Sequence, residues 1–147
     1  MSDVQIRPAI AADQALIKQM VRAERLDPSA LDWSHFLMAE RQGEVIGIGQ
    51  IRPHPKCREL GSLIVKPAYR GTGIGGQIIQ ALVASQSGDV YLDCRSELET
   101  YYQRFGFEQI RLQQAPSPIK YKVLIGNILF RLFGMRMIVM KRASTPK

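Results

Sequence analysis

The stretch YRGTGIGGQII, residues 69–79, decides how the rest of the sequence is interpreted. Four of its residues are glycines, and they lie between a short apolar run, residues 60–65, and a helical pattern that continues to Val83. Glycine lacks a Cβ atom, so successive main-chain N–H groups can close around an anion, and the N-terminus of a following helix adds partial positive charge. Because a simple turn needs fewer glycines, the stretch predicts a phosphate-binding loop.

Two phosphate-binding patterns overlap in this loop. Gly71, Gly73 and Gly76 match G-x-G-x-x-G, the fingerprint of dinucleotide-binding domains. Asp93 follows at about the distance at which that fingerprint expects an acidic residue. The fingerprint, however, places its first glycine at the tip of a strand, whereas five residues separate Val65 from Gly71. The residues before the loop also predict a helix and a hairpin, so a dinucleotide site is disfavoured.

The second pattern, R-x-x-G-x-G, is formed by Arg70, Gly73 and Gly75, and its surroundings extend the match. The segment SLIVKPAYRGTGIGGQIIQALV, residues 62–83, resembles the central motif of the GNAT (Gcn5-related N-acetyltransferase) superfamily. YYQRFGF, residues 101–107, resembles that family's downstream Y-x-x-x-G-F motif. Both motifs at this spacing are specific, and we expect residues 1–147 to form a single GNAT acetyltransferase domain.

The resemblance implies an α+β fold in three layers, with a central mixed, mostly antiparallel, twisted sheet flanked by helices. In that fold two central strands splay apart, here residues 60–65 and 90–94. Ser96 and Glu99 match a capping box at the start of a helix. The apolar patterns predict strands over 5–7, 36–39, 45–51, 60–65, 90–94, 107–112 and 137–140, and helices over 13–25, 74–83, 96–105 and 119–133.

The resemblance implies acetyl-CoA as cosubstrate, and the sequence contains no metal-ligand spacing. The loop would hold the pyrophosphate, with Arg70 adding a charge-assisted contact. The main chain of Leu63 and Val65 would hold the pantetheine arm like an added strand, and an N–H near Leu63 or Ile64 would polarise the thioester carbonyl. The residues implied in cofactor binding are Leu63, Ile64, Val65, Arg70, Gly71, Thr72, Gly73, Ile74 and Gly75.

Two residues are implied in catalysis. Glu59 stands where several GNAT members carry a general-base glutamate, which would deprotonate the acceptor amine directly or through water. The alternative is an ordinary carboxylate at a strand start, facing solvent. Tyr102 takes the tyrosine position of Y-x-x-x-G-F and would protonate the CoA thiolate, since a phenol stays protonated at neutral pH. Core packing is the alternative for Tyr102 and the preferred role for Tyr101.

One family feature is missing: the asparagine that often opens the third helix is replaced in CRSELE, where Arg95 or Ser96 would have to substitute for it. Cys94 in that run has no histidine near it in the sequence, so we expect a core residue and not a nucleophile. Cys57 and Cys94 form no disulfide framework, which indicates free thiols and a cytoplasmic protein. Residues 1–8 show no signal peptide.

The net charge of +7 is unevenly distributed. No acidic residue follows Glu108, and residues 109–147 carry +8 while residues 1–108 sum to −1. The asymmetry is compatible with an anionic ligand, a membrane surface or nucleic acid, although a solvated basic face is the plainer interpretation. A nucleic-acid partner is disfavoured because no aromatic residues that could stack on nucleobases alternate with the basic residues. A transmembrane span is disfavoured because residues 119–140 carry too many charges. Residues 119–133 would dock on the sheet with their basic residues outward, or supply a homodimer interface.

The acceptor is the least defined part of the prediction. By the resemblance, its pocket is formed by residues 26–35 and 113–135, with Trp33 and His35 as candidate wall residues. The segment around the glycine loop also resembles amino-acid N-acetyltransferases, and a carboxylate-bearing acceptor would fit near Arg52. We therefore expect a small-molecule amine or amino acid as acceptor. The alternatives are a protein or peptide N-acetyltransferase and a non-catalytic acyl-CoA-binding module.

Overall fold

The computed structural model describes residues 3–144, and its chain groups into two compact units. The first unit contains Met1–Arg52 and Leu60–Ser85, and the second contains Pro53–Glu59 and Gln86–Lys147. Each unit has its own buried apolar cluster, described below. Within the described range no helix is both long and apolar enough to cross a membrane.

The strands follow the order β1-β2-β3-β4-β5-β7-β6 in one seven-stranded sheet. Pairing is antiparallel between β1 and β2, β2 and β3, β5 and β7, and β6 and β7, whereas β4 and β5 run parallel. This mixed, mostly antiparallel sheet confirms the predicted fold class. The strands are β1 (Gln5–Pro8), β2 (Phe36–Arg41), β3 (Glu44–Pro53), β4 (Arg58–Val65), β5 (Val90–Arg95), β6 (Glu108–Ile110) and β7 (Met137–Arg142).

Two helices belong to the first unit. In α1 (Gln14–Ala23) the helical spacing of apolar residues buries Ile17, Met20 and Val21 in a cluster with residues of β2, β3 and β4. The second helix, α2 (Ile74–Ala84), lies very close to β3, because β3 carries glycine at positions 47 and 49. A Cβ atom at Gly49 would lie 2.8 Å from Cγ2 of Ile78, so only glycine allows this packing.

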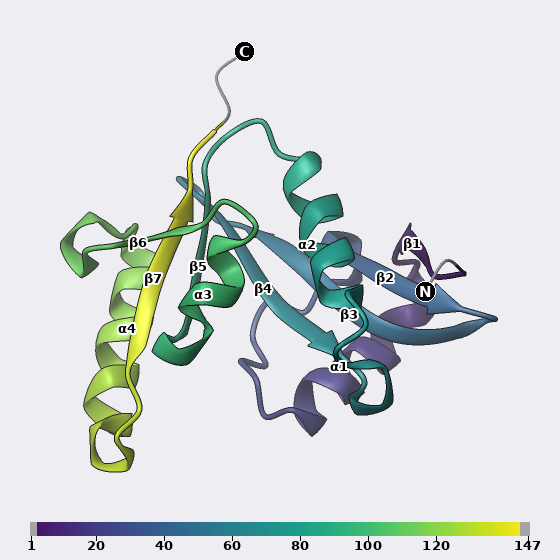
Figure 1. Cartoon of the computed structure of the whole chain (residues 1–147), viewed down its shortest axis with the longest axis horizontal. Helices are drawn as coiled ribbons and strands as arrows, with labels where there is room; N and C mark the ends of the chain where they lie inside the picture. The colour runs from purple at the N-terminus through teal and green to yellow at the C-terminus, as the bar shows by residue number, and fades with distance from the viewer. Residues whose placement is uncertain (1–2, 145–147) are drawn as a thin grey trace. The chain divides into compact units, whose positions relative to one another are not determined.

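The second unit is built on β7, which pairs with β5 over six residues and with the short edge strand β6 (Figure 1). The long helix α4 (Ser117–Phe130) runs alongside β7, and a short 3-10 turn, Arg131–Phe133, follows it. Ile119 and Val123 of α4 are buried against Val139. The side chain of Asn127 accepts from the main-chain N–H of Met137 at 2.7 Å and donates to its carbonyl, which fixes the helix to the strand.

The predicted capping box at Ser96 is wrong. Residues 96–98 form a 3-10 turn before the short helix α3 (Glu99–Gln103), and Arg95 occupies the capping position without a side-chain cap. The main-chain N–H of Ser96 donates instead to the carbonyl of Arg136 at 2.8 Å. The sixth strand is likewise shorter than expected, because a 3-10 turn over Leu112–Gln114 ends the extended backbone.

Candidate active site

The glycine loop has the backbone of an anion-binding site. Gly71 and Gly73 adopt left-handed conformations, with φ of +78° and +86°, and no atom lies within 4 Å of where their Cβ atoms would stand. Gly73 is the N-cap of α2, whose first N–H groups have no partner inside the helix. Thr72 closes the turn by donating from Oγ1 to the carbonyl of Tyr69 at 2.6 Å. Such an open loop at the N-terminus of an eleven-residue helix fits a pyrophosphate.

The side chain of Arg70 is bound by other residues of the first unit. Its Nε donates to the carbonyl of Val65 at 2.9 Å, and its Nη2 lies 2.8 Å from Oε1 of Glu24 at the end of α1. About half of the side chain is exposed. The guanidinium therefore already has a carboxylate partner, and the Val65 carbonyl already accepts a hydrogen bond. Sequence patterns gave no indication of Glu24, which is 46 residues away in the chain.

Ser62 interrupts the regular backbone of β4. It has a φ of +51°, an uncommon value for a residue other than glycine, and its side chain is buried. Oγ of Ser62 accepts from Nε2 of Gln50 at 3.0 Å and from Nη2 of Arg52 at 3.1 Å. A left-handed residue inside a strand breaks the alternation of main-chain groups directly before Leu63. The preceding Gly61 was the sequence signal for this irregularity, because glycine inside a strand often marks one.

Arg52, the residue expected near a carboxylate of the acceptor, is buried. Only 5% of the residue is exposed, and its Nη1 atom lies 3.9 Å from Oδ2 of Asp27. Its guanidinium lies over Gly61, where a Cβ atom would approach Nη1 to 2.8 Å. The arginine therefore fills the space that the glycine leaves. Arg52 thus contacts two neighbouring residues of β4, Gly61 and Ser62.

Glu59 lies at the centre of a charged cluster in the second unit. Only 2% of Glu59 is exposed, so the alternative of a solvent-facing carboxylate is wrong. Its Oε1 is 2.8 Å from Nε2 of His54, and its Oε2 accepts from Nζ of Lys122 at 2.6 Å. The same Nζ lies 3.3 Å from Oδ2 of Asp93. We call His54, Glu59, Lys122 and Asp93 the charged cluster; the sequence predicted only one of its members as functional.

The turn before β4 positions His54 for this contact. Its main-chain N–H donates to the carbonyl of Cys57 at 3.0 Å, and Cys57 is itself anchored in the apolar cluster of the second unit. The imidazole is about a quarter exposed, so it is the part of the His54–Glu59 pair that a molecule from solvent can reach. The five-residue spacing between the histidine and the glutamate was a usable signal, whereas Lys122 lies 63 residues further on.

Tyr102 lies on the buried side of α3. Its ring packs edge-on against Tyr101 and Phe107, with centroid distances of 5.1 and 6.1 Å. Burial, with a smaller contribution from Cys94 and Asp93, raises the pKa of Tyr102 well above its usual value. The phenol is therefore a neutral proton donor over the whole physiological range. Tyr101 is only half-buried, beside Phe105 and under the guanidinium of Arg104, and burial raises its pKa as well.

Cys94 has the surroundings of a structural residue. Burial raises the pKa of its thiol to about 12, and Sγ lies 3.9 Å from Sδ of Met140. Such a thiol carries no appreciable thiolate at neutral pH, which agrees with the expectation that it is not a nucleophile. Arg95, the residue nearest to the missing asparagine, is exposed beside Glu97 at 3.7 Å. Across residues 3–144 no group of three or more His, Cys, Asp or Glu side chains could hold a metal ion.

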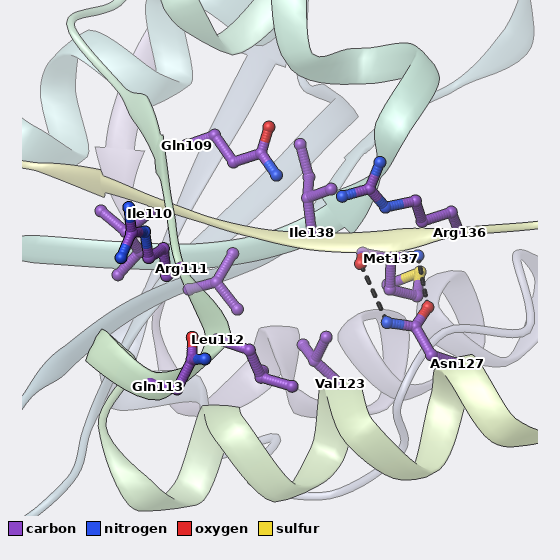
Figure 2. Close-up of a pocket in the computed structure, with 11 residues that line it drawn as sticks. Gln109, Ile110, Arg111, Leu112, Gln113, Val123, Asn127, Arg136, Met137 and Ile138 are labelled. Carbon is purple, nitrogen blue, oxygen red and sulfur yellow. Dashed lines mark hydrogen bonds between the residues drawn. The ribbon is translucent and has the colours of Figure 1, made fainter.

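A hollow of about 610 Å³ opens in the second unit between α4, β6 and β7 (Figure 2). Leu112 and Val123 line its apolar side, and the amide of Asn127 closes one end through its bonds to Met137. Gln113, Val123 and Asn127 belong to the segment expected to contribute to the acceptor pocket. No residue implied in catalysis or cofactor binding lines the hollow, so its location does not identify it as the acceptor site.

The structure divides the predicted site residues between the two units. The cofactor-binding residues, from Leu63 to Gly75, all lie in the first unit, on the end of β4 and the loop into α2. Glu59 and Tyr102 both lie in the second unit. The structure therefore defines an anion-binding loop and, separately, a buried carboxylate and a buried phenol.

A family model for the acetyltransferase (GNAT) domain matches residues 32–109, more than half of the chain. The match covers the glycine loop, Glu59 and Tyr102 together. The chain belongs to the GNAT acetyltransferase family.

Curated relatives are similar over part of the chain. The N-alpha-acetyltransferase RimI of Mycobacterium tuberculosis is 29% identical over 89 residues, which cover 55% of this chain and 56% of RimI. An uncharacterized protein of Mycobacterium leprae, ML0378, is 39% identical over 64 residues, or 41% of this chain and 18% of that protein. The aligned regions thus span less than two thirds of either relative.

Solved structures share the fold. N-acetylglutamate synthase from Neisseria gonorrhoeae, determined with coenzyme A and N-acetyl-glutamate, superposes with a TM-score of 0.77 at 18% identity. That match covers 97% of this chain and 35% of the synthase. Rv2747 from Mycobacterium tuberculosis, determined in complex with CoA, has a TM-score of 0.73 at 19% identity over 96% of this chain and 99% of its own.

Proposed function

We propose that this protein is an acetyl-CoA-dependent N-acetyltransferase formed by residues 1–147 as a single domain. It transfers the acetyl group to a primary amine of a small molecule or an amino acid by direct attack, without an acyl-enzyme. The observation that carries the proposal is the open loop of left-handed Gly71 and Gly73 at the N-terminus of α2. This loop fits the pyrophosphate of CoA, which is the ligand shared by the structural neighbours described above.

The first unit holds the cosubstrate. Main-chain N–H groups from Gly71 to Gly75 bind the pyrophosphate, and Arg70 exchanges Glu24 for a phosphate oxygen. The main chain of Leu63 and Val65 binds the pantetheine arm, with Arg70 releasing the Val65 carbonyl. The irregular backbone at Ser62 supports a role for the N–H of Leu63 or Ile64 as donor to the thioester oxygen. Acetyl-CoA itself supplies an activated acetyl group.

The second unit removes the proton of the acceptor amine. A protonated amine cannot attack, because its lone pair is occupied, and its pKa lies near 10 for a lysine-like group. Glu59 is buried, so its carboxylate reaches the amine through His54, the exposed end of the pair. His54 takes the proton, and Glu59 orients the imidazole and stabilises its charged form. Lys122 holds the other carboxylate oxygen in place.

Tyr102 completes the transfer. As the amine nitrogen bonds to the acetyl carbon, the carbon–sulfur bond breaks and the sulfur leaves as a thiolate. The phenol of Tyr102, kept neutral by burial, donates its proton to that sulfur. The attacking nitrogen loses its second proton as the amide forms, and this proton restores the phenol of Tyr102. The proton that His54 received returns to solvent, so charge and protons balance over the cycle.

The class of acceptor is supported by the relatives. N-acetylglutamate synthase acts on an amino acid, and RimI is an N-alpha-acetyltransferase. An α-amine is common to both, and we propose that the acceptor presents one. A peptide N-terminus is the second candidate, favoured by the RimI similarity. A cytoplasmic location agrees with two buried free cysteines.

Thermal shift and CoA release test the proposal together. Acetyl-CoA should raise the melting temperature, and NAD at the same concentration should not, because both carry a pyrophosphate but only acetyl-CoA has a pantetheine arm for the main chain of Leu63 and Val65. CoA release is then followed over a panel of amines, amino acids and short peptides. No shift with acetyl-CoA would disprove the proposal, and a shift without turnover on any amine would favour a non-catalytic binding module.

A further inference from the structure

The outer face of α4 and the turn after it form an exposed apolar surface. We call this surface the α4 patch; its residues are between 41% and 91% exposed, Leu132 most of all. In soluble proteins scattered apolar residues are ordinary, but a contiguous patch of this size marks an interaction site. The patch consists of Tyr121, Leu124, Ile125, Ile128, Leu129, Leu132 and Phe133.

The α4 patch is separate from the packing of α4 against β7. Ile119 and Val123 already fill the inner face, and Asn127 fixes that face to Met137. Ile125 and Ile128 follow at helical positions on the opposite side, where they are 57% and 66% exposed. A helix that is apolar on both faces is normally covered on both. The outer face of α4 therefore implies a second apolar contact.

The charges around the patch are all positive. Lys120 precedes it on α4, Arg131 begins the 3-10 turn between Leu129 and Leu132, and Arg136 follows shortly after its end. Among the described residues none of these three forms an ion pair with a carboxylate. The sequence contains no acidic residue from position 109 to the end. The expectation that residues 119–133 dock with their basic residues outward is thus only partly correct. Aliphatic side chains take the outward positions, and the basic residues lie around them.

A second copy of the chain fits this surface poorly. The patch contains seven exposed apolar side chains, which could form part of an interface between two copies. In a symmetric antiparallel pair that crosses near Ile125, however, Lys120 of one copy lies opposite Arg131 of the other. Like charges at the edge of an apolar contact oppose association, and this part of the chain has no acid to neutralise them.

An anionic bilayer surface complements both the apolar side chains of the α4 patch and the positive charges around them. Aliphatic side chains enter the boundary between headgroups and acyl chains, while the flanking basic residues meet anionic headgroups. Apart from the Tyr121 hydroxyl, the patch offers no hydrogen-bonding side chain, so it has little to orient a specific protein partner. We propose that the α4 patch docks this protein on anionic lipid membranes as a peripheral protein.

Vesicle sedimentation tests this proposal with residues 1–147. The protein is mixed with vesicles of phosphatidylcholine alone and with vesicles that contain phosphatidylglycerol, at low and at high salt. We expect binding only to the anionic vesicles, and weaker binding at high salt. Equal binding to both kinds of vesicle, or none to either at low salt, would overturn the proposal.

Substitutions then distinguish vesicle binding through the apolar side chains of the patch from binding by electrostatic attraction alone. Ile128→Ser/Leu132→Ser should weaken binding to anionic vesicles by about tenfold or more, because two inserted side chains lose their apolar contact. Ile10→Ser/Leu26→Ser replaces two exposed apolar residues of the first unit and should leave binding unchanged. Binding that survives the first pair of substitutions would be electrostatic only and would contradict docking through the patch.

Sedimentation equilibrium without vesicles provides the remaining test. We expect a monomer at the concentrations used for the vesicle experiment. A dimer that Ile128→Ser/Leu132→Ser dissociates, and that Ile10→Ser/Leu26→Ser does not, would assign the patch to a homodimer and overturn membrane docking.

Discussion

Lys122 brings its ammonium to within 2.6 Å of Oε2 of Glu59, a carboxylate that is almost completely buried. The contact joins α4 to the first residues of β4, which are far apart in the sequence. A buried carboxylate is stable only with a partner, since desolvation disfavours its charge. Lys122 therefore stabilises the buried carboxylate of Glu59, a role that its position on a basic, apolar helix does not indicate.

Lys122→Met should destabilise the protein by about 1–3 kcal/mol, because Glu59 loses its ammonium partner while staying buried. The lysine is one-third exposed, so we place the loss below that of a fully buried pair. Urea unfolding gives the free energy. Lys120→Met on the same helix, which breaks no ion pair, is the matched control. In the double variant Glu59→Gln/Lys122→Met the two losses should not add; full additivity would mean that the residues do not interact.

His54→Gln should lower kcat by roughly a hundredfold or more while the KM for acetyl-CoA is retained, because the amine proton loses its acceptor. Steady-state CoA release gives both constants. Glu59→Gln should cause a similar loss, and the double variant should lose little more than either single variant if they act as one unit. Independent losses that multiply in the double variant would contradict a relay through His54.

Tyr102→Phe should abolish most of the turnover and leave acetyl-CoA binding unchanged, since only the proton donor is removed. Tyr101→Phe, on the same helix and half-buried, is the matched control and should keep its activity. Because burial raises the pKa of Tyr102, its phenol stays protonated and causes no loss of rate below about pH 10. An alkaline loss of rate near pH 8 that disappears in Tyr102→Phe would contradict this assignment.

The thiol of Cys94 should make the protein less stable at alkaline pH. In the unfolded chain the thiol ionises around its ordinary value of 9.0, whereas burial raises the pKa to about 12 in the folded protein. Between these values the unfolded state binds fewer protons, so the free energy of unfolding falls as pH rises from about 9 to about 12. Denaturant unfolding across this range should show the fall, and Cys94→Ala should show a smaller one. Equal slopes would exclude Cys94 as the cause.

Gly71→Ala and Gly73→Ala should each weaken acetyl-CoA binding and lower stability by about 1–2 kcal/mol, because both glycines need a left-handed backbone. Space is not the reason, since nothing lies near either Cβ position. Gly88→Ala is the control: its surroundings are equally open, and no left-handed backbone is required there. Isothermal titration should show unchanged binding for Gly88→Ala. The same result for Gly71→Ala would remove this loop from the cofactor site.

Local patterns predicted most of the fold. Helical spacing in α1 and the glycines before α2 are short-range signals, and the elements form close to where they were expected. The capping box failed because the Ser96 N–H bonds to the carbonyl of Arg136, a long-range partner that outweighs the local pattern. A single sequence does not reveal such partners.

The same distinction applies to the site. The loop glycines could be recognised because their role depends on their own backbone. The relation of Glu59 to Lys122, and of Arg70 to Glu24, depends on how distant segments fold together, and nothing near these residues in the sequence indicates it. The left-handed backbone of Ser62 was not predicted either, because residues 60–65 were expected to form an uninterrupted strand.

The close contact between Arg52 and Gly61 has an evolutionary consequence. A Cβ atom at position 61 would lie 2.8 Å from Nη1 of Arg52, so the buried guanidinium would have to shift and disturb its bond to Ser62. Positions 52 and 61 should therefore vary together among descendants of this gene, with a larger residue at 61 tolerated only after the arginine has been replaced. Such lineages would still keep a hydroxyl at position 62, because the side chain of Gln50 also donates to Oγ of Ser62.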